Sequence, residues 1–192
     1  FVTSSSTLAG GIAAGLGVGP SQIDATIGVT KAYTTRVGQG PFPTELSEKE
    51  LALFPDHFAS REVGTTTGRK RRIGWLDLFL LKHTICLNGA DSLALMKLDI
   101  LDGVKEIQIC TGYEGFSSFP TTVEGLLSAK PIYEVMEGWN SSTKGVHRFE
   151  ELPPAAKRYL KRIEEVCQLP ISLVSLGPER ERSLWLHPLL DR

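Results

Sequence analysis

Four cations follow a short run of threonines in the segment of residues 63–77, which reads VGTTTGRKRRIGWLD. The cations are Arg69, Lys70, Arg71 and Arg72. Threonine hydroxyls and the backbone N–H groups of a glycine turn donate hydrogen bonds, and a guanidinium group matches two carboxylate or phosphate oxygens at once. Because the sequence returns to apolar residues at Ile73, we interpret this segment as a binding loop for a small, multiply charged anion.

The residues Met96–Asp99, which read MKLD, have the composition of a base-recognition element. The carboxylate of Asp99 can accept two hydrogen bonds from the guanine edge, and the alkyl stem of Lys97 can lie over the ring. Together, the two segments predict a nucleotide enzyme that also holds a carboxylate or phosphate substrate.

Each segment also has a simpler explanation. The RKRR block is typical of a nucleic-acid patch or a localisation signal, and the aspartate of an isolated KxD triplet is often a turn former. Lys and Arg total 21 against 22 Asp and Glu, so the overall charge does not indicate a polyanionic partner. Because the positive charge is local, it favours a ligand site over a nucleic-acid surface.

Length and composition place the chain in a broad class. With 192 residues, 41% of them hydrophobic, it suits one domain of ordinary size or a large part of a bigger one. The three cysteines, Cys86, Cys110 and Cys167, form no CxxC motif, and we interpret them as buried thiols in a reducing compartment. No apolar run reaches the roughly 20 residues of a membrane span, and no signal peptide is visible.

The elements that must position these segments follow a mixed α/β pattern. We expect helices over residues 4–17, 47–58, 75–88 and 152–169, strands over 28–37, 132–136, 171–176 and 183–186, and loops over 38–43 and 116–130. The second helix begins with a capping box of Ser47 and Glu50, and the third ends at Gly89. Residues 92–101 and 104–113 are expected to form a β-hairpin that turns at 101–103.

The histidines and tryptophans have no spacing that indicates chemistry. We expect each of His57, His83, His147 and His187 to be a surface or packing residue, without metal-ligand spacing. Trp75, Trp139 and Trp185 are expected in the core.

Several longer motifs resemble the adenylosuccinate synthetase family. They are FVTSSSTLAGGIAAGLGVGP (1–20), KAYTTRVGQGPFPTEL (31–46), GTTTGRKRRIGWLD (64–77), KLDILDG (97–103), PIYEVMEGW (131–139) and SLGPER (175–180). The resemblance covers the C-terminal half of such an enzyme, or slightly less, and the chain opens on Phe1 inside the first motif. We therefore expect a C-terminal portion, with residues 1–62 on the IMP side of the core and residues 63–192 carrying the aspartate loop and the guanine-binding region.

The resemblance implies an α/β fold, a mixed sheet with surrounding helices and a β-hairpin. It also implies a ligase that joins IMP and L-aspartate with GTP as co-substrate, giving adenylosuccinate, GDP and phosphate. In this family the γ-phosphoryl group moves to the purine oxygen of IMP, and the aspartate amine then displaces it. Mg²⁺, a cytoplasmic or, in a plant, plastidic location and a homodimer are also implied, with no nucleic-acid or membrane partner.

Site residues carry over by position. The aspartate loop would comprise Thr65, Thr66, Thr67, Gly68, Arg69, Lys70 and Arg71. IMP would contact Thr3, Val37, Gly38 and Arg69, and GTP would contact Arg71, Lys97, Leu98, Asp99, Ser175, Leu176 and Gly177. Leu176 replaces the small or β-branched residue of the family, which is harmless if that position acts through its backbone.

The family's phosphate loop, catalytic acid and base, and Mg²⁺ ligands belong to its N-terminal half. The resemblance therefore implies no catalytic and no metal-binding residue in this chain, and the isolated chain is expected to be inactive. Two alternatives remain. KLD is similar to the NKxD element of small GTPases but lacks the asparagine, and the chain could be a non-catalytic guanine-nucleotide-binding or regulatory domain derived from the same fold.

Overall fold

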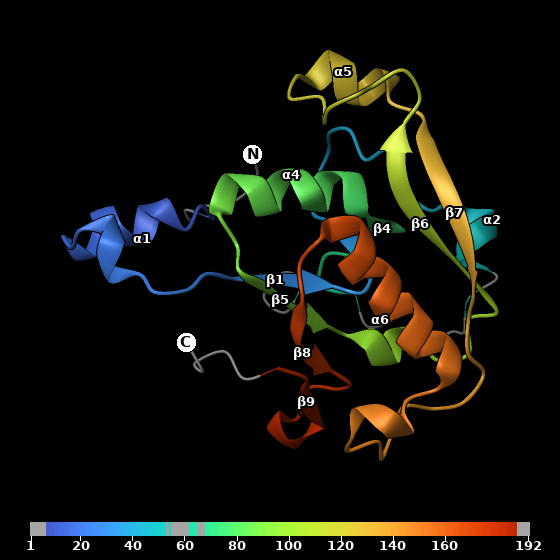
Figure 1. Cartoon of the computed structure of the whole chain (residues 1–192). Helices are drawn as coiled ribbons and strands as arrows, with labels where there is room; N and C mark the ends of the chain where they lie inside the picture. Colours follow the sequence, from blue (N-terminus) through green and yellow to red (C-terminus); the bar gives the residue numbers. More distant parts are fainter. Residues whose placement is uncertain (1–6, 53, 55–61, 65–67, 188–192) are drawn as a thin grey trace.

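A parallel sheet forms the centre of the structure, a computed structural model that describes residues 7–52, 54, 62–64 and 68–187. Strands β1 (Ile27–Lys31), β5 (Ser92–Met96) and β8 (Ile171–Ser175) run parallel, and β9 (Ser183–Trp185) closes one edge antiparallel to β8 (Figure 1). In the two inner strands most side chains are buried, as expected for parallel strands covered on both faces. Strands β8 and β9 confirm the two strands predicted over residues 171–176 and 183–186.

Two smaller sheets accompany the central one. Strand β4 (Leu76–Asp77) pairs parallel with β6 (Glu106–Tyr113), which pairs antiparallel with β7 (Pro131–Glu137) along one flank of the molecule (Figure 1). Strand β2 (Thr34–Arg36) pairs antiparallel with β3 (Arg72–Gly74). The single strand expected over residues 28–37 is thus divided into β1 and β2, because Ala32 and Tyr33 turn into the core between them.

The hairpin expected from residues 92–113 is wrong. Both edges of β5 are already occupied by β1 and β8, so no edge remains on which β6 could pair. Between the two strands the chain forms a 3-10 turn, η2 (Leu98–Leu101), whose apolar side chains are buried. The turn at 101–103 exists, but it leads the chain into β6, which pairs with β7, and the N–H of Gly103 donates to the carbonyl of Trp139, just beyond β7, at 2.9 Å.

Most predicted helices are present with shorter bounds. The helices are α1 (Gly10–Leu16), α2 (Glu48–Leu51), α4 (Leu78–Asn88), α5 (Val123–Ser128) and α6 (Pro154–Cys167), with 3-10 turns η1 (Pro20–Gln22), η3 (Phe149–Glu151) and η4 (Arg180–Arg182). The capping box of Ser47 and Glu50 is confirmed, and Gly17 and Gly89 take the left-handed conformation that ends α1 and α4.

Two helix predictions and one loop prediction need correction. The helix expected from residue 75 begins at Leu78, because Asp77 ends β4 and accepts a hydrogen bond from the N–H of Leu80 at 2.9 Å. The region 116–130 is not all loop, since Thr122 caps α5 in the same way. The helix that begins at Glu48 ends at Leu51, and residues 55–58 of its predicted length lie outside the described residues.

Helix α6 supplies the largest helical share of the core. Its predicted apolar stripe, which includes Tyr159, Leu160 and Ile163, is buried. The hydroxyl of Tyr159 donates to the carbonyl of Ala32 at 2.6 Å and so ties α6 to the end of β1. On the opposite side, Arg162 donates to Glu134 of β7 at 2.8 Å. Helix α6 therefore connects the central sheet with the β6–β7 pair.

Two of the buried-residue predictions are wrong. Trp75 and Trp139 are in the core, but Trp185 is 64% exposed because it lies on the edge strand β9. Cys110 and Cys167 are buried, whereas Cys86 is exposed on α4. His83 stacks on Phe119 at 5.2 Å, which confirms its packing role. Within the part of the chain that the structure describes, no helix is long and apolar enough to cross a membrane.

Candidate functional site

Three parallel strands end at the same edge of the central sheet, and two of them lead into predicted site residues there. Lys31 is the last residue of β1, Lys97 directly follows β5, and Ser175 is the last residue of β8. In open α/β sheets, ligands bind at the carboxyl ends of the strands. The predicted base triplet and the turn at 175–177 therefore lie on the side of the sheet where a ligand is expected.

The base triplet begins with an unusual backbone conformation. Lys97 has a φ of 64°, in the left-handed region that costs a side chain with a Cβ about 1–2 kcal/mol. This conformation turns the chain from β5 into the η2 turn, where Leu98 is fully buried and Asp99 is 9% exposed. Conformations of this kind persist where surrounding contacts fix them, and they cluster at ligand sites.

The second part of the predicted base site is a tight turn after β8. The hydroxyl of Ser175 donates to the carbonyl of Gly177 at 2.9 Å, and the N–H of Leu176 donates to the carbonyl of Arg182 at 2.8 Å. A Cβ on Gly177 would lie 2.6 Å from the guanidinium of Arg182, which packs over this turn. Because the side chain of Leu176 is fully buried in the core, only its backbone is available to a ligand.

The cation-rich segment forms a narrow loop closed by backbone hydrogen bonds. The N–H of Arg71 donates to the carbonyl of Glu62 at 3.0 Å, and the N–H of Gly64 donates to the carbonyl of Arg69 at 2.8 Å. Gly68 takes a left-handed φ of 63° near the tip, and Arg69 and Lys70 are exposed. The predicted contacts Thr3, Thr65, Thr66 and Thr67 lie outside the described residues.

Glu62, at the base of this loop, connects it to the base triplet. Its fully buried carboxylate accepts hydrogen bonds from Lys97 Nζ at 2.5 Å and from the Tyr33 hydroxyl at 2.5 Å. Arg71 Nη1 lies 3.0 Å from its other oxygen, and Lys31 Nζ lies 3.3 Å from the same oxygen. We call Glu62 with these four donors the Glu62 cluster. Sequence reasoning missed it, because a lone glutamate before Val-Gly has no local signature.

The charges within the Glu62 cluster control its protonation. Burial alone would raise the pKa of Glu62, but hydrogen bonds from Lys97 and Tyr33 and the charge of Lys31 lower it to about 2. The pKa of Lys31 is lowered, mainly by burial, and that of Tyr33 is raised by burial and by its bond to Glu62. The cluster therefore places one buried carboxylate against the basic side chains of Lys31, Arg71 and Lys97.

The fourth cation of the predicted block has a structural partner instead. Arg72 forms an ion pair with Glu45 and donates to the carbonyls of Gly38 at 3.2 Å and Gly40 at 2.8 Å. It thereby fixes the loop that carries Val37 and Gly38, two predicted IMP contacts. Val37 is 42% exposed and Gly38 has a φ of 78°, so this loop presents backbone and a small apolar side chain to its surroundings.

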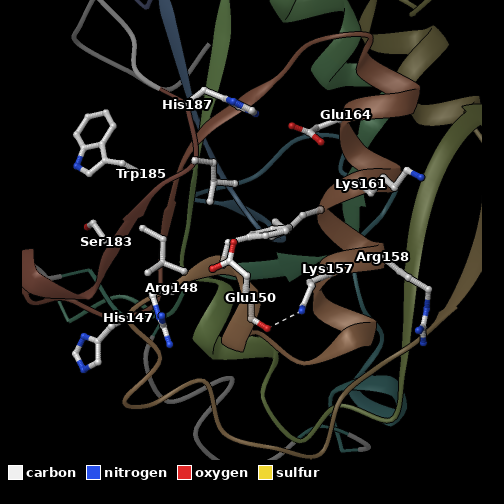
Figure 2. A pocket seen from close by; sticks show the side chains of 14 residues that line it. His147, Arg148, Glu150, Lys157, Arg158, Lys161, Glu164, Ser183, Trp185 and His187 are labelled. Carbon is white, nitrogen blue, oxygen red and sulfur yellow. Dashed lines mark hydrogen bonds between the residues drawn. The ribbon is translucent and has the colours of Figure 1, made fainter.

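A large pocket lies away from this edge of the sheet. It has a volume of about 880 Å³ between α6, β9 and residues 147–150, and its rim carries Trp185, His187, Lys157 and Lys161 (Figure 2). Lys157 Nζ donates to the carbonyl of Glu150 at 2.7 Å across one end. None of the residues predicted to bind aspartate, IMP or GTP lines this pocket.

No group of three or more His, Cys, Asp or Glu side chains suited to a metal ion occurs in the ranges 7–52, 62–64 and 68–187 or at residue 54. The acidic side chains at the sheet edge, Glu62 and Asp99, are both buried, and Glu62 is occupied by cations. The donor set at this edge therefore fits an anionic ligand rather than a cation.

Known proteins share this sequence and fold. The family model of adenylosuccinate synthetase matches residues 1–184. The adenylosuccinate synthetase of Neisseria meningitidis serogroup C is 50% identical over 192 residues, covering 97% of this chain and 44% of that protein. That of Caldanaerobacter subterraneus is 49% identical, with the same coverage. The solved structure of fully ligated adenylosuccinate synthetase from Plasmodium falciparum matches with a TM-score of 0.87 and 36% identity, over 97% of this chain and 45% of that chain.

A largely parallel sheet, with residues 97–99 and the turn at 175–177 after the carboxyl ends of its strands, defines an α/β protein whose ligand site is expected at that edge. Within that class, this chain belongs to the adenylosuccinate synthetase family. The chain spans about 44% of the length of the curated relatives it matches.

Proposed function

We propose that this chain supplies the aspartate and guanine sites of a GTP-dependent ligase that joins IMP and L-aspartate. The products are adenylosuccinate, GDP and phosphate. The observation that carries the proposal is the ion-pair connection through Glu62 between Arg71 of the cation loop and Lys97 of the base triplet. A carboxylate-binding loop and a base-binding element joined in this way suit an enzyme that holds an amino acid and a nucleotide together.

The proposed contacts fall into three groups. Aspartate is bound by Thr65, Thr66, Thr67, Gly68, Arg69, Lys70 and Arg71, IMP by Thr3, Val37, Gly38 and Arg69, and GTP by Arg71, Lys97, Leu98, Asp99, Ser175, Leu176 and Gly177. The exposure of Arg69 and Lys70 and the burial of Asp99 support an outer carboxylate site and an inner base site. Residues 1–62 provide the IMP side and residues 63–192 the other two sites, and both regions contribute strands to the central sheet.

These residues bind and orient the reactants. An oxygen on a purine ring is a poor leaving group, so phosphorylating it allows the aspartate amine to displace it as phosphate. Arg69 and Arg71 hold carboxylate or phosphate oxygens, and Asp99 selects the guanine of GTP. Mg²⁺ bound to the phosphates would neutralise their charge, and we assign no Mg²⁺ ligand to this chain. We further propose a cytoplasmic homodimer.

The test uses the full-length gene product that carries this sequence. Purified protein with IMP, L-aspartate, GTP and Mg²⁺ is expected to form adenylosuccinate and GDP in equal amounts, and ATP is expected to support little turnover. Absence of product under these conditions would refute the ligase. If GTP still binds without turnover, the protein is instead a guanine-nucleotide-binding domain derived from the same fold.

A further inference from the structure

The Glu62 cluster joins two loops that are distant in the sequence. Glu62 and Arg71 face each other across the base of the cation loop through a backbone bond and an ion pair, both at 3.0 Å. Lys97, 35 residues further along the chain, reaches the other carboxylate oxygen at 2.5 Å. One carboxylate thus fixes a residue of the proposed aspartate site and a residue of the proposed GTP site at once.

The exposure of the partners shows which side of the cluster faces outward. The carboxylate of Glu62 is 0% exposed, whereas the side chains of Arg71 and Lys97 are 29% and 35% exposed. Within the Glu62 cluster, three basic side chains surround one carboxylate, so basic groups outnumber acidic ones there. Glu62 therefore lies beneath the cations, and the cations keep donors and surface for an anionic ligand.

Each partner retains the group that its proposed ligand needs. The ammonium of Lys97 is bound to Glu62, which leaves its alkyl stem as the part available to a base. Arg71 uses Nη1 for Glu62 and has further N–H donors for a carboxylate or phosphate. Because both side chains end on the same anchor, ordering one of them by a ligand restricts the other as well.

We propose that Glu62 is a positioning residue that couples the nucleotide and amino-acid sites, so that guanine nucleotide and L-aspartate each strengthen the binding of the other. This inference depends on the proposed function for the identity of the two ligands. Glu62 touches neither ligand and acts through Arg71 and Lys97. Coupling between two sites in a protein is typically about 5- to 150-fold in affinity, and it is equal in both directions.

The experiment measures the dissociation constant of GTP by calorimetry, with and without saturating L-aspartate, in the full-length gene product. In the wild type, L-aspartate is expected to lower this constant at least about 5-fold. In Glu62→Gln, which keeps the shape but removes the charge, the ratio is expected to fall to about 1. Glu62→Asp keeps the charge and is expected to restore part of the ratio.

Two further variants keep the result interpretable. Asp77→Asn alters another buried carboxylate, which accepts from the Tyr113 hydroxyl outside the site, and it is expected to leave the ratio unchanged. Tyr33→Phe removes one donor to Glu62 while keeping the ring, and it is expected to lower the ratio even if Glu62→Gln does not fold.

The outcomes separate this inference from the proposed function. Suppose that the wild type makes adenylosuccinate and that Glu62→Gln leaves the ratio of GTP dissociation constants, without and with L-aspartate, unchanged. This result would overturn the coupling and leave the ligase in place. If Glu62→Gln does not fold, an unchanged ratio in Tyr33→Phe would have the same meaning. A loss of the ratio in Asp77→Asn as well would also overturn it, because a general loss of stability would then explain the effect. If the wild type binds GTP but makes no product, the proposed function alone is refuted.

Discussion

Arg69 is exposed near the tip of the cation loop, where the structure shows its backbone carbonyl engaged by Gly64. We expect Arg69→Leu in the full-length protein to raise the KM for L-aspartate and lower kcat. A charge-assisted hydrogen bond contributes about 1.5–3 kcal/mol, which corresponds to roughly 10- to 100-fold. Arg69→Lys is expected to recover only part, because an ammonium lacks the planar fork.

Steady-state kinetics with varied L-aspartate check this prediction. Arg158→Leu is the matched control, since Arg158 is an exposed arginine paired with Glu137 outside the proposed site. Unchanged aspartate kinetics in Arg69→Leu would remove Arg69 from the aspartate site.

Asp99 is buried at the carboxyl edge, where a carboxylate can accept from the ring N–H and the amino group of guanine. Asp99→Asn exchanges one acceptor for a donor and is expected to weaken GTP use by about 1.5–3 kcal/mol. It is also expected to improve XTP, whose second carbonyl can accept from the new amide. The measurement is kcat/KM for GTP, XTP and ATP, and an equal loss for all three nucleotides would indicate a purely structural role.

Glu62 makes the stability of the protein dependent on acid pH. Burial opposes its ionisation, but its cation partners lower its pKa from 4.5 to about 2. This stabilisation, roughly 3 kcal/mol, is present above pH 4.5 and is lost as the pH falls toward 2. We expect Glu62→Gln to lower the free energy of unfolding at pH 7 and to approach the wild type near pH 2 in urea titrations.

Asp77 provides the opposite sign for comparison. Its pKa is raised, mainly by burial, so its ionisation lowers the stability of the protein at neutral pH. We therefore do not expect Asp77→Asn to lower the free energy of unfolding at pH 7 in a way that vanishes in acid. A Glu62→Gln difference that is constant with pH would contradict the ion-pair account.

For individual residues, the sequence predicted the two binding segments but not the Glu62 cluster that joins them. The motifs at 64–71 and 97–99 are contiguous, so their residue types could be read together. Glu62, Lys31 and Tyr33 meet only through folding, since Glu62 lies 31 residues from Lys31 and 29 from Tyr33. The role of Arg72 was also hidden, because its partners Glu45 and Gly38 belong to a different loop.

Among the elements, those with local signals were predictable. Helix α6 has an apolar stripe, and α4 ends at a glycine with a left-handed φ, both of which follow from nearby residues. The pairing of β6 was not predictable from its neighbours in sequence, because β1 and β8 occupy both edges of β5. These strands begin 65 residues before and 79 residues after β5, counted from Ser92 to Ile27 and to Ile171.

The end of helix α6 offers a test of backbone strain. Gln168 is exposed and has a φ of 53°, at the position where glycine is favoured after a helix. Gln168→Gly is expected to stabilise the protein by about 1 kcal/mol, because the left-handed conformation costs a residue with a Cβ about that much. Urea unfolding of Gln168→Gly and Gln168→Ala checks this, and equal midpoints for the two variants would contradict it.

For the molecule as a whole, the sheet unites residues from nearly the full length of the chain, from Ile27 to Trp185. The two regions that the sequence suggested, 1–62 and 63–192, both contribute to it, so the proposed IMP, aspartate and GTP contacts share one framework. The relatives are more than twice as long, which explains why the reaction is proposed for the full-length gene product rather than for these residues alone.

The unequal burial of the three cysteines makes one of them a site for selective chemical labelling. Cys86 is exposed on α4, whereas burial raises the pKa of Cys110 to about 12 and that of Cys167 to about 11. Because the thiolate is the species that reacts, a maleimide dye at neutral pH is expected to attach to the native chain at one position. Mass spectrometry should show one label in the folded chain and three after denaturation. Two or more labels on the folded chain would show that the packing around β6 or α6 opens. A single dye at Cys86 would give a fluorescent reporter on α4.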